Sequence, residues 1–219
     1  LNSYKWVNEN RLTEPVIDKN GTKTEVKWQE AYETAAKELK KFKPEEVMIL
    51  GSAKASTESS FVLKKFAGDV LKTKNIDYLP HIDESFVDNF MGIADRTPNS
   101  QGAEAVGIKP GEDGISRDSL AEAINSGKIK AIFLMEDDFD DYPGLAKAVD
   151  KLELFIILAY NKSELVEKAH IALPASTYAE SEGVFVNKDK RAQHFSPALV
   201  TKENMRYMGM KMSRWDKFG

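Results

Sequence analysis

Cysteine is the residue type that this chain lacks entirely: none of its 219 residues is a cysteine. The absence excludes a disulfide framework, a thiolate nucleophile, cysteine-ligated zinc and an ordinary cysteine-ligated iron–sulfur cluster. Any redox chemistry in which the chain takes part therefore needs a cofactor held without thiolates, or belongs to a partner.

Long apolar runs and dense basic blocks are also missing. No run approaches the roughly 20 apolar residues that span a bilayer, so we expect no direct membrane insertion. The formal net charge is −4, and no Lys/Arg block precedes the C-terminal tail, so we expect no nucleic-acid partner. The chain begins at Leu1 and shows no signal-peptide pattern. The missing initiator Met suggests a processed chain or an excised fragment.

What is present is typical of one α/β domain. Short apolar runs at residues 47–50, 131–135 and 154–158 predict neighbouring parallel strands in one buried sheet. Segments with helical spacing alternate with them, so we expect helices on both faces of the sheet. The predicted fold class is α/β, a parallel sheet flanked by helices. We expect one domain over residues 1–200 and a C-terminal docking tail over residues 201–219.

Two predicted helices have apolar residues at helical spacing that we expect to face the core. The first covers residues 28–42 and ends before Pro44; its inward residues would be Trp28, Ala31, Tyr32, Ala35, Leu39 and Phe42. The second follows a cap at Ser56 or Thr57; its inward residues would be Phe61, Val62, Leu63, Phe66, Val70 and Leu71.

An acidic run follows the predicted strand 131–135, where ligands bind in parallel sheets. Glu136, Asp137 and Asp138 are candidate ligands of Mg²⁺ or Ca²⁺. The alternative is a solvated acidic loop, which we favour because no partner Lys, Arg or phosphate-binding loop accompanies the run.

A second candidate site is the turn that begins at Gly51 and Ser52, between a predicted strand and a predicted helix. A phosphate could lie at that helix N-terminus. The turn matches neither a dinucleotide fingerprint nor a Walker loop, so we favour a structural role.

The other residues with chemical potential fit no catalytic pattern. The three histidines, His81, His170 and His194, lie far apart without metal-ligand spacing and are interpreted as ordinary surface or core residues. Ser176 and Thr177 lack a nucleophile elbow. We therefore predict no catalytic residue.

Three segments, taken in order, resemble the molybdopterin oxidoreductase family. The first contains residues 11–15, Asn20-Gly21 and a Trp28 that opens an Ala-containing helix. The second is residues 51–58, continued to Asn75-Ile76-Asp77. The third runs from residues 99–103 through 127–131 to Glu136-Asp137, and it resumes with Leu173, Pro174, Ala175, Ser176, Thr177, Ala179, Glu180, Gly183, Asn187, Arg191, Gln193 and Phe195.

Two departures from that family shape what the resemblance implies. Family enzymes have a cysteine or selenocysteine on molybdenum soon after a segment like residues 75–77, whereas residues 78–82 here are Tyr-Leu-Pro-His-Ile. Family members also have a long middle region between that point and a segment like residues 99–102, and here only about twenty residues separate the two. The resemblance thus implies a truncated domain of the formate dehydrogenase and DMSO reductase type. Glu180 and Asn187 lie where relatives approach the pterin, and we expect them to satisfy turn backbone instead.

The resemblance is strongest to the large iron–sulfur subunit of NADH–quinone oxidoreductase, and it implies a non-catalytic structural domain. Its iron–sulfur clusters would lie in an adjoining domain, with no cofactor in this chain. Partners would be the other subunits of the peripheral arm, including the flavin-bearing NADH dehydrogenase subunits. The location would be cytoplasmic, peripheral to the inner membrane through the complex.

Two other functions remain open. One is a reduced oxidoreductase domain that still binds a nucleotide or a pterin cofactor. The other is a free-standing interaction protein. The tail, with Met205, Met208, Met210, Met212, Trp215 and Phe218 among basic residues, could pack on its own domain or on a partner.

Overall fold

The computed structural model describes residues 9–90 and 92–199. The predicted C-terminal docking tail lies outside these residues. The strands are β1 (Val16–Lys19), β2 (Thr22–Glu25), β3 (Val47–Ser52), β4 (Ile76–Leu79), β5 (Ala131–Met135), β6 (Leu154–Ala159), β7 (Ile171–Pro174), β8 (Gly183–Val186) and β9 (Ala192–Phe195). The α-helices are α2 (Trp28–Leu39), α3 (Thr57–Lys65), α4 (Ser100–Val106), α5 (Arg117–Asn125), α6 (Pro143–Ala148) and α7 (Glu164–Lys168). Short helical turns are η1 (Pro44–Glu46), η2 (Phe66–Leu71), η3 (Glu84–Phe86) and η4 (Val149–Lys151).

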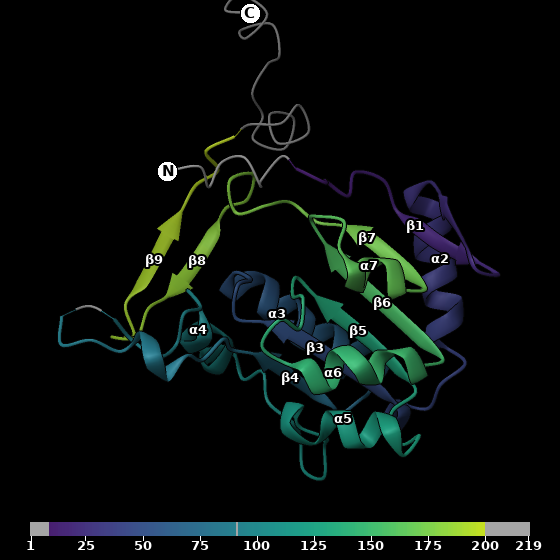
Figure 1. Cartoon of the computed structure of the whole chain (residues 1–219), viewed down its shortest axis with the longest axis horizontal. Helices are drawn as coiled ribbons and strands as arrows, with labels where there is room; N and C mark the ends of the chain where they lie inside the picture. Colours follow the sequence, from purple (N-terminus) through teal and green to yellow (C-terminus); the bar gives the residue numbers. More distant parts are fainter. Residues whose placement is uncertain (1–8, 91, 200–219) are drawn as a thin grey trace, which may run out of the picture.

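A seven-stranded sheet forms the centre of the domain, in the order β2-β1-β7-β6-β5-β3-β4 (Figure 1). The five strands from β7 to β4 are parallel, and β1 and β2 extend one edge as an antiparallel pair. The predicted strands at 47–50, 131–135 and 154–158 are β3, β5 and β6, and they are neighbours as expected. The α/β fold class and the buried parallel sheet are therefore confirmed.

Alternate residues of each central strand point to opposite faces, and each face has its own core. Met48, Ile132 and Phe155 pack with Leu120 of α5 and Leu145 of α6 in one cluster. The other cluster contains Ile49, Ala131 and Ile156 of the sheet, packed with α2 and α3 through Ala31, Ala35, Leu39 and Leu63. Helices thus cover both faces, with α5 and α6 in front and α2 and α3 behind in Figure 1.

Side-chain caps and one glycine begin and end several helices. Ser56 accepts a hydrogen bond from the Ser59 backbone N–H at the start of α3, as predicted. Ser163 caps α7 in the same way through the Val166 N–H. Gly127, with φ of 74°, follows α5 in the left-handed conformation that glycine adopts without a Cβ clash.

The predicted inward faces of α2 and α3 are partly wrong. In α2, Ala31, Ala35 and Leu39 are buried, but Tyr32 is 56% exposed. Beside the buried Leu63 of α3, Phe61 and Val62 are exposed, and Val70 of η2 is 65% exposed. The spacing correctly predicts helices, but a groove separates them, and within residues 9–90 and 92–199 no element covers the apolar side chains that line it.

A hairpin that the sequence analysis did not predict packs beside α3. Its strands β8 and β9 pair antiparallel, and the rings of Phe185 and Phe195 stack across them with centroids 4.4 Å apart. The turn between them contains Lys190 at φ of 60°. A Cβ on Gly183 would lie 2.7 Å from Cβ of Ser56, so glycine is needed where β8 meets the start of α3.

Candidate functional site

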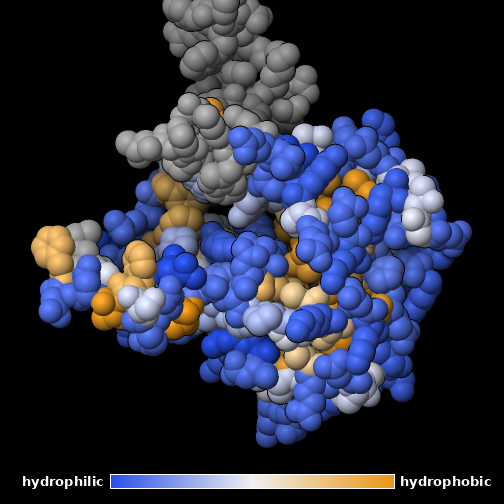
Figure 2. Space-filling model, in the orientation of Figure 1, coloured by the Kyte–Doolittle hydropathy of each residue, from blue (hydrophilic) through white to orange (hydrophobic). Residues whose placement is uncertain are grey.

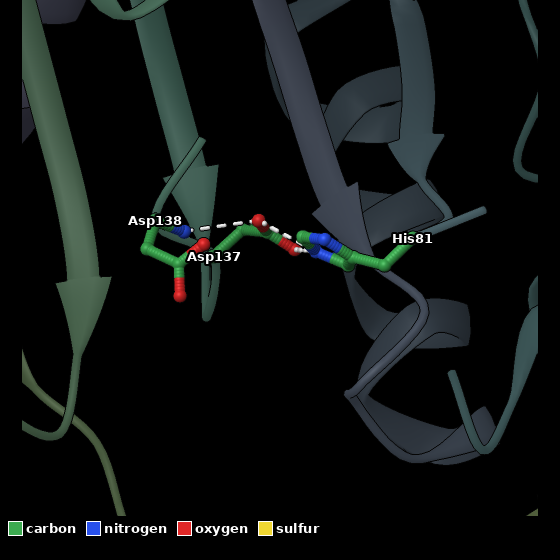
Figure 3. Close-up of side chains that lie close together, drawn as sticks. All are labelled: His81, Asp137 and Asp138. Carbon is green, nitrogen blue, oxygen red and sulfur yellow. Dashed lines mark hydrogen bonds and ion pairs between the residues drawn. The ribbon is translucent and has the colours of Figure 1, made fainter. Parts of the chain in front are cut away.

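The carboxyl ends of three parallel strands bring together a buried polar cluster (Figure 3). Ser52 is the last residue of β3, His81 follows β4 by two residues, and Asp137 follows β5 by two residues. Because parallel strands end at one edge of the sheet, residues 85 positions apart meet there. All three side chains belong to buried residues.

His81 lies between two carboxylates. Its Nε2 atom is 3.1 Å from Oδ1 of Asp137, and its Nδ1 atom is 2.6 Å from Oδ2 of Asp141. Asp137 is held from its other side by the Ser52 hydroxyl, which donates to Oδ2 at 2.7 Å. The imidazole is thus fixed in orientation through both ring nitrogens.

These contacts shift the proton affinities of both partners. The hydrogen bond with Asp137 raises the pKa of His81 above its ordinary value, and burial of the ring opposes this only in part. Burial favours the neutral form of Asp137, but the hydrogen bonds from His81 and Ser52 and the charge of Lys54 hold its pKa below the ordinary value. The pair is therefore most stable as imidazolium and carboxylate.

The outer carboxylates have cationic partners, so the sequence-based view that no Lys or Arg accompanies the acidic run was wrong. Lys54, from the turn after β3, lies 3.2 Å from Oδ2 of Asp138. Arg96 donates to Oδ2 of Asp141 at 3.1 Å. These partners lie 84 and 45 positions away in sequence and are adjacent only in the fold.

Glu136 does not join this cluster, although it was one of the three predicted metal ligands. The potential ligand group contains His81, Asp137 and Asp138, whose ligand atoms lie within 4.8 Å of one another. Glu136 has φ of 56°, and burial raises its pKa to about 7. Together with Lys54, Asp137, Asp138 and Tyr160 it lines a cavity of about 580 Å³ at the strand ends.

The turn that begins at Gly51 and Ser52 has three of its backbone N–H groups already hydrogen-bonded. The N–H groups of Ala53, Lys54 and Ala55 donate to oxygens of Leu79 and Ser52. Gly51 allows close packing, because a Cβ there would lie 3.1 Å from Leu63. These three N–H groups are therefore not available to a phosphate, which favours the structural interpretation of the turn.

The start of α3 is likewise engaged by the hairpin. Glu58 accepts a hydrogen bond from the Val184 backbone, and Oδ1 of Asn99 accepts one from the Val186 backbone. Asn99 also donates to the carbonyl of Ala55. These contacts place β8 against the candidate turn and support its structural interpretation.

Glu180 and Asn187 satisfy turn backbone, as predicted. Glu180 accepts from the Thr177 N–H and forms an ion pair with Arg11 at 2.9 Å. Oδ1 of Asn187 accepts from the backbone of Asp189 and Arg191 inside the β8–β9 turn. Both side chains stabilise local loops.

The three histidines have different environments. His81 is part of the strand-end cluster, so its interpretation as an ordinary residue was incomplete. Nδ1 of His170 accepts a hydrogen bond from the Phe155 N–H, as a structural core histidine does. His194 is exposed on β9.

An apolar groove lies on the other side of the sheet from α5 and α6, between α2 and α3. Its volume is about 980 Å³. Phe133 of β5 and Leu158 of β6 are only partly buried there, although they belong to the centre of the sheet. The remaining apolar lining comes mainly from Trp28, Tyr32, Ala35, Leu39, Phe42, Val62, Leu63, Phe66, Val70, Leu71, Met135 and Leu173.

A second exposed apolar surface surrounds η3. Figure 2 shows hydrophobic side chains gathered on the lobe that protrudes at the left. Phe86 is 59% exposed and Phe90 is 89% exposed, and they are accompanied by Ile82, Val87 and Ile93. This segment lies between residues 77 and 99, where the predicted shortened middle region falls.

None of the helices in residues 9–90 and 92–199 has both the length and the hydropathy that a membrane crossing requires.

Comparison with known proteins places these features in a family. Segments 11–92 and 84–208 match the molybdopterin oxidoreductase family. The alpha subunit of an F420-dependent formate dehydrogenase 2 from Methanococcus maripaludis is 44% identical over 80 residues, which are 36% of this chain and 12% of the relative. A subunit of the NADH-quinone oxidoreductase from Pseudomonas putida is 35% identical over 85 residues, which are 37% of this chain and 9% of the relative.

A third relative is the alpha subunit of an NADPH-Fe(3+) oxidoreductase from Geobacter sulfurreducens. It is 33% identical over 85 residues, which are 37% of this chain and 10% of the relative. The matches thus span about a tenth of the relatives' length, and each relative is named as one subunit of an oxidoreductase or dehydrogenase. Since the family match covers most of the described sequence, the chain belongs to the molybdopterin oxidoreductase family.

Proposed function

We propose that this chain is a non-catalytic structural domain of the large iron–sulfur subunit of an NADH–quinone oxidoreductase. It would support electron transfer from NADH to quinone in the peripheral arm, with the iron–sulfur clusters in an adjoining domain. The observation that carries the proposal is the apolar groove between α2 and α3. The central strands of a parallel sheet are normally buried on both faces, and here another subunit or domain would complete the burial.

The chemistry of the strand ends supports a role without a pterin. Tyr78 follows the family-like segment 75–77, is buried in β4 and donates to Glu104 at 3.0 Å. Residues 78–82 provide no thiol or selenol for molybdenum. The separate family matches of residues 11–92 and 84–208 meet at the η3 lobe, which supports a shortened middle region there.

The proposed assembly implies particular partners and a particular location. The chain would contact other peripheral-arm subunits, including the flavin-bearing NADH dehydrogenase subunits. It would be cytoplasmic and peripheral to the inner membrane through the complex. A groove rich in aromatic residues and Val or Leu is the kind of surface that obligate partners cover.

One observation favours a second candidate, a reduced domain that still binds a nucleotide or a pterin. The cavity of about 580 Å³ at the ends of β5 and β6 is within the size range of small-molecule sites. Its carboxylates disfavour an anionic ligand, so we place it second. If this chain is instead a free-standing interaction protein, it would use the same exposed groove but would have no partner among the respiratory subunits.

Two adjacent residues of α3 provide a matched test. Val62 lines the groove, whereas the exposed neighbour Phe61 does not. The chain would be co-expressed with the peripheral-arm subunits encoded in the same genome, and assembly would be measured by mass photometry. We expect Val62→Lys to weaken assembly at least about tenfold, because it places a charge in an apolar interface, and Phe61→Lys to have little effect.

Equal effects of the two substitutions, or no assembly with the unmodified chain, would contradict the proposal. Stoichiometric pterin fluorescence and molybdenum in the purified chain would instead support the second candidate.

A further inference from the structure

Three side chains at the strand ends have the arrangement of a divalent metal site, and the sequence pattern indicated only Asp137 and Asp138 of the three. A ring nitrogen of His81, a carboxylate oxygen of Asp137 and one of Asp138 lie within 4.8 Å of one another. Figure 3 shows the Asp137 carboxylate directed toward the His81 ring, with Asp138 beside it on the same loop. The set contains an imidazole, so it is more than a group of acidic residues.

The distances suit ligands of one ion. Nε2 of His81 lies 3.1 and 3.2 Å from the two oxygens of Asp137. Two ligands at about 2.1 Å from an ion and at a right angle to each other are about 3 Å apart. An ion near the midpoint of the His81–Asp137 pair, displaced toward Asp138, would therefore reach both without a backbone movement.

The surroundings of His81 supply the outer shell that metal-binding histidines have. Its other ring nitrogen, Nδ1, is 2.6 Å from Asp141, and Asp141 is in turn held by Arg96 at 3.1 Å. A carboxylate at Nδ1 holds the tautomer with its proton on Nδ1, in which the lone pair of Nε2 can bind a metal, and it increases the basicity of Nε2. Asp137 is oriented similarly by the Ser52 hydroxyl.

The cluster also has an entry path and an open side. Asp137 and Asp138 line the cavity of about 580 Å³ at the strand ends. The Asp138 side chain is 42% exposed, whereas that of Asp137 is fully buried. Water could therefore complete the coordination from the cavity, as in sites that keep an open position.

Lys54 competes for the same place. Its ammonium group is 3.2 Å from Asp138 and its side chain is 30% exposed, so it can move into solvent when a cation arrives. In the absence of an ion, the proton on His81 and this ammonium neutralise the two carboxylates.

We propose that His81, Asp137 and Asp138 bind one first-row divalent transition metal ion of the Zn²⁺ or Co²⁺ class, with Asp141 as a positioning residue. Imidazole favours these ions over Mg²⁺ and Ca²⁺, which prefer all-oxygen sites. This inference is independent of the proposed role in an NADH–quinone oxidoreductase, because it concerns binding by the chain alone.

The test is a titration of the full chain with Co²⁺, followed by visible absorption, and with Zn²⁺, followed by calorimetry, at about pH 7.5, with binding at Nε2 displacing the proton from that nitrogen. We expect one equivalent to bind with d–d absorption of a nitrogen and oxygen environment. His81→Ala should weaken binding at least about 100-fold, and Asp141→Asn about 10- to 100-fold. The matched control is His194→Ala, which removes an exposed imidazole and should leave the affinity unchanged.

A further variant distinguishes a metal site from a simple ion-pair network. Lys54→Ala removes the competing ammonium and should strengthen Co²⁺ binding several-fold. Circular dichroism would establish that each variant folds, and Asp138→Asn replaces His81→Ala as the ligand variant if the latter does not fold. The proposal is overturned if the unmodified chain binds no stoichiometric Co²⁺ or Zn²⁺ at millimolar concentration, or if the ligand variant and His194→Ala bind equally.

Discussion

The two faces of the central sheet have the same strands beneath them but differ in how they are covered. On the face with α5 and α6, Met48, Ile132 and Phe155 are fully buried. On the face with α2 and α3, the neighbouring residues Phe133 and Leu158 contact solvent through the groove. The difference indicates that the first face is complete within this chain and that the second is suited to contact with something else.

The two ends of the sheet differ in a similar way. At the carboxyl end, His81 lies between carboxylates and gains affinity for a proton. Nearer the amino end of β7, His170 is half-buried and accepts a backbone hydrogen bond, which its neutral ring can do. One histidine is thus stabilised charged, and the other is stabilised neutral.

The largest expected effect compares two phenylalanines on adjacent strands. Phe155→Ala on the complete face should reduce the free energy of unfolding by about 3–5 kcal/mol, because it leaves a cavity in a closed core. Phe133→Ala in the groove should cost about 1–2 kcal/mol, since part of that ring already contacts water. Urea unfolding followed by circular dichroism measures both; equal losses would show that the two faces are equally complete.

The pH dependence of stability should have opposite signs for the two histidines. Burial and the charge of Lys23 lower the pKa of His170, while Asp18 and Glu38 oppose this shift. The unfolded chain therefore binds the proton more readily, and the stability from neutral His170 is lost as pH falls below about 6.5. The hydrogen bond with Asp137 raises the pKa of His81, so its contribution is complete below about pH 6.5 and is lost as pH rises through the higher folded value.

Urea unfolding from about pH 5 to 8, the range in which histidine titrates, would separate these contributions in the presence of EDTA. The stability difference between the unmodified chain and His170→Gln should grow in favour of the unmodified chain with increasing pH. The corresponding difference for His81→Gln should shrink. Glu136, whose pKa is about 7, titrates in the same window but is common to all three proteins. If the stability difference changed with pH in the same direction for both variants, the assigned charge states would be contradicted.

The smallest expected effect concerns the groove surface. Tyr32→Ser and Val62→Ser should each change the free energy of unfolding of the isolated chain by no more than about 0.5 kcal/mol, because both side chains are more than half exposed. Thermal unfolding is a sufficient measurement. A loss of several kcal/mol from either substitution would mean that the groove is closed in solution.

The central strands could be predicted because the pattern that indicates each strand lies within one short segment of the sequence. The apolar runs at residues 47–50, 131–135 and 154–158 are too short and too continuous for amphipathic helices, and each became a central strand. The hairpin β8–β9 was missed, although Val184 and Phe185 followed by the turn-forming residues 187–190 gave a usable signal.

The site and the groove depended on contacts that local patterns do not contain. His81 and Asp137 are 56 positions apart, and only the parallel order of β4, β3 and β5 brings them together. Helical spacing identified Val62 as part of an apolar face but carried no information on whether another element covers it. The sequence correctly placed the acidic residues at the end of a strand. It did not reveal which side chains from other segments contact them.

The central claim is that the face with α2 and α3 is the docking face of this domain. It is tested most directly by hydrogen–deuterium exchange of the full chain, alone and in the presence of the peripheral-arm subunits. We expect slower exchange in α2, α3 and η2 on assembly, with α5 and α6 unchanged. Protection confined to α5 and α6, or no protection in either pair of helices when assembly is complete, would contradict the claim.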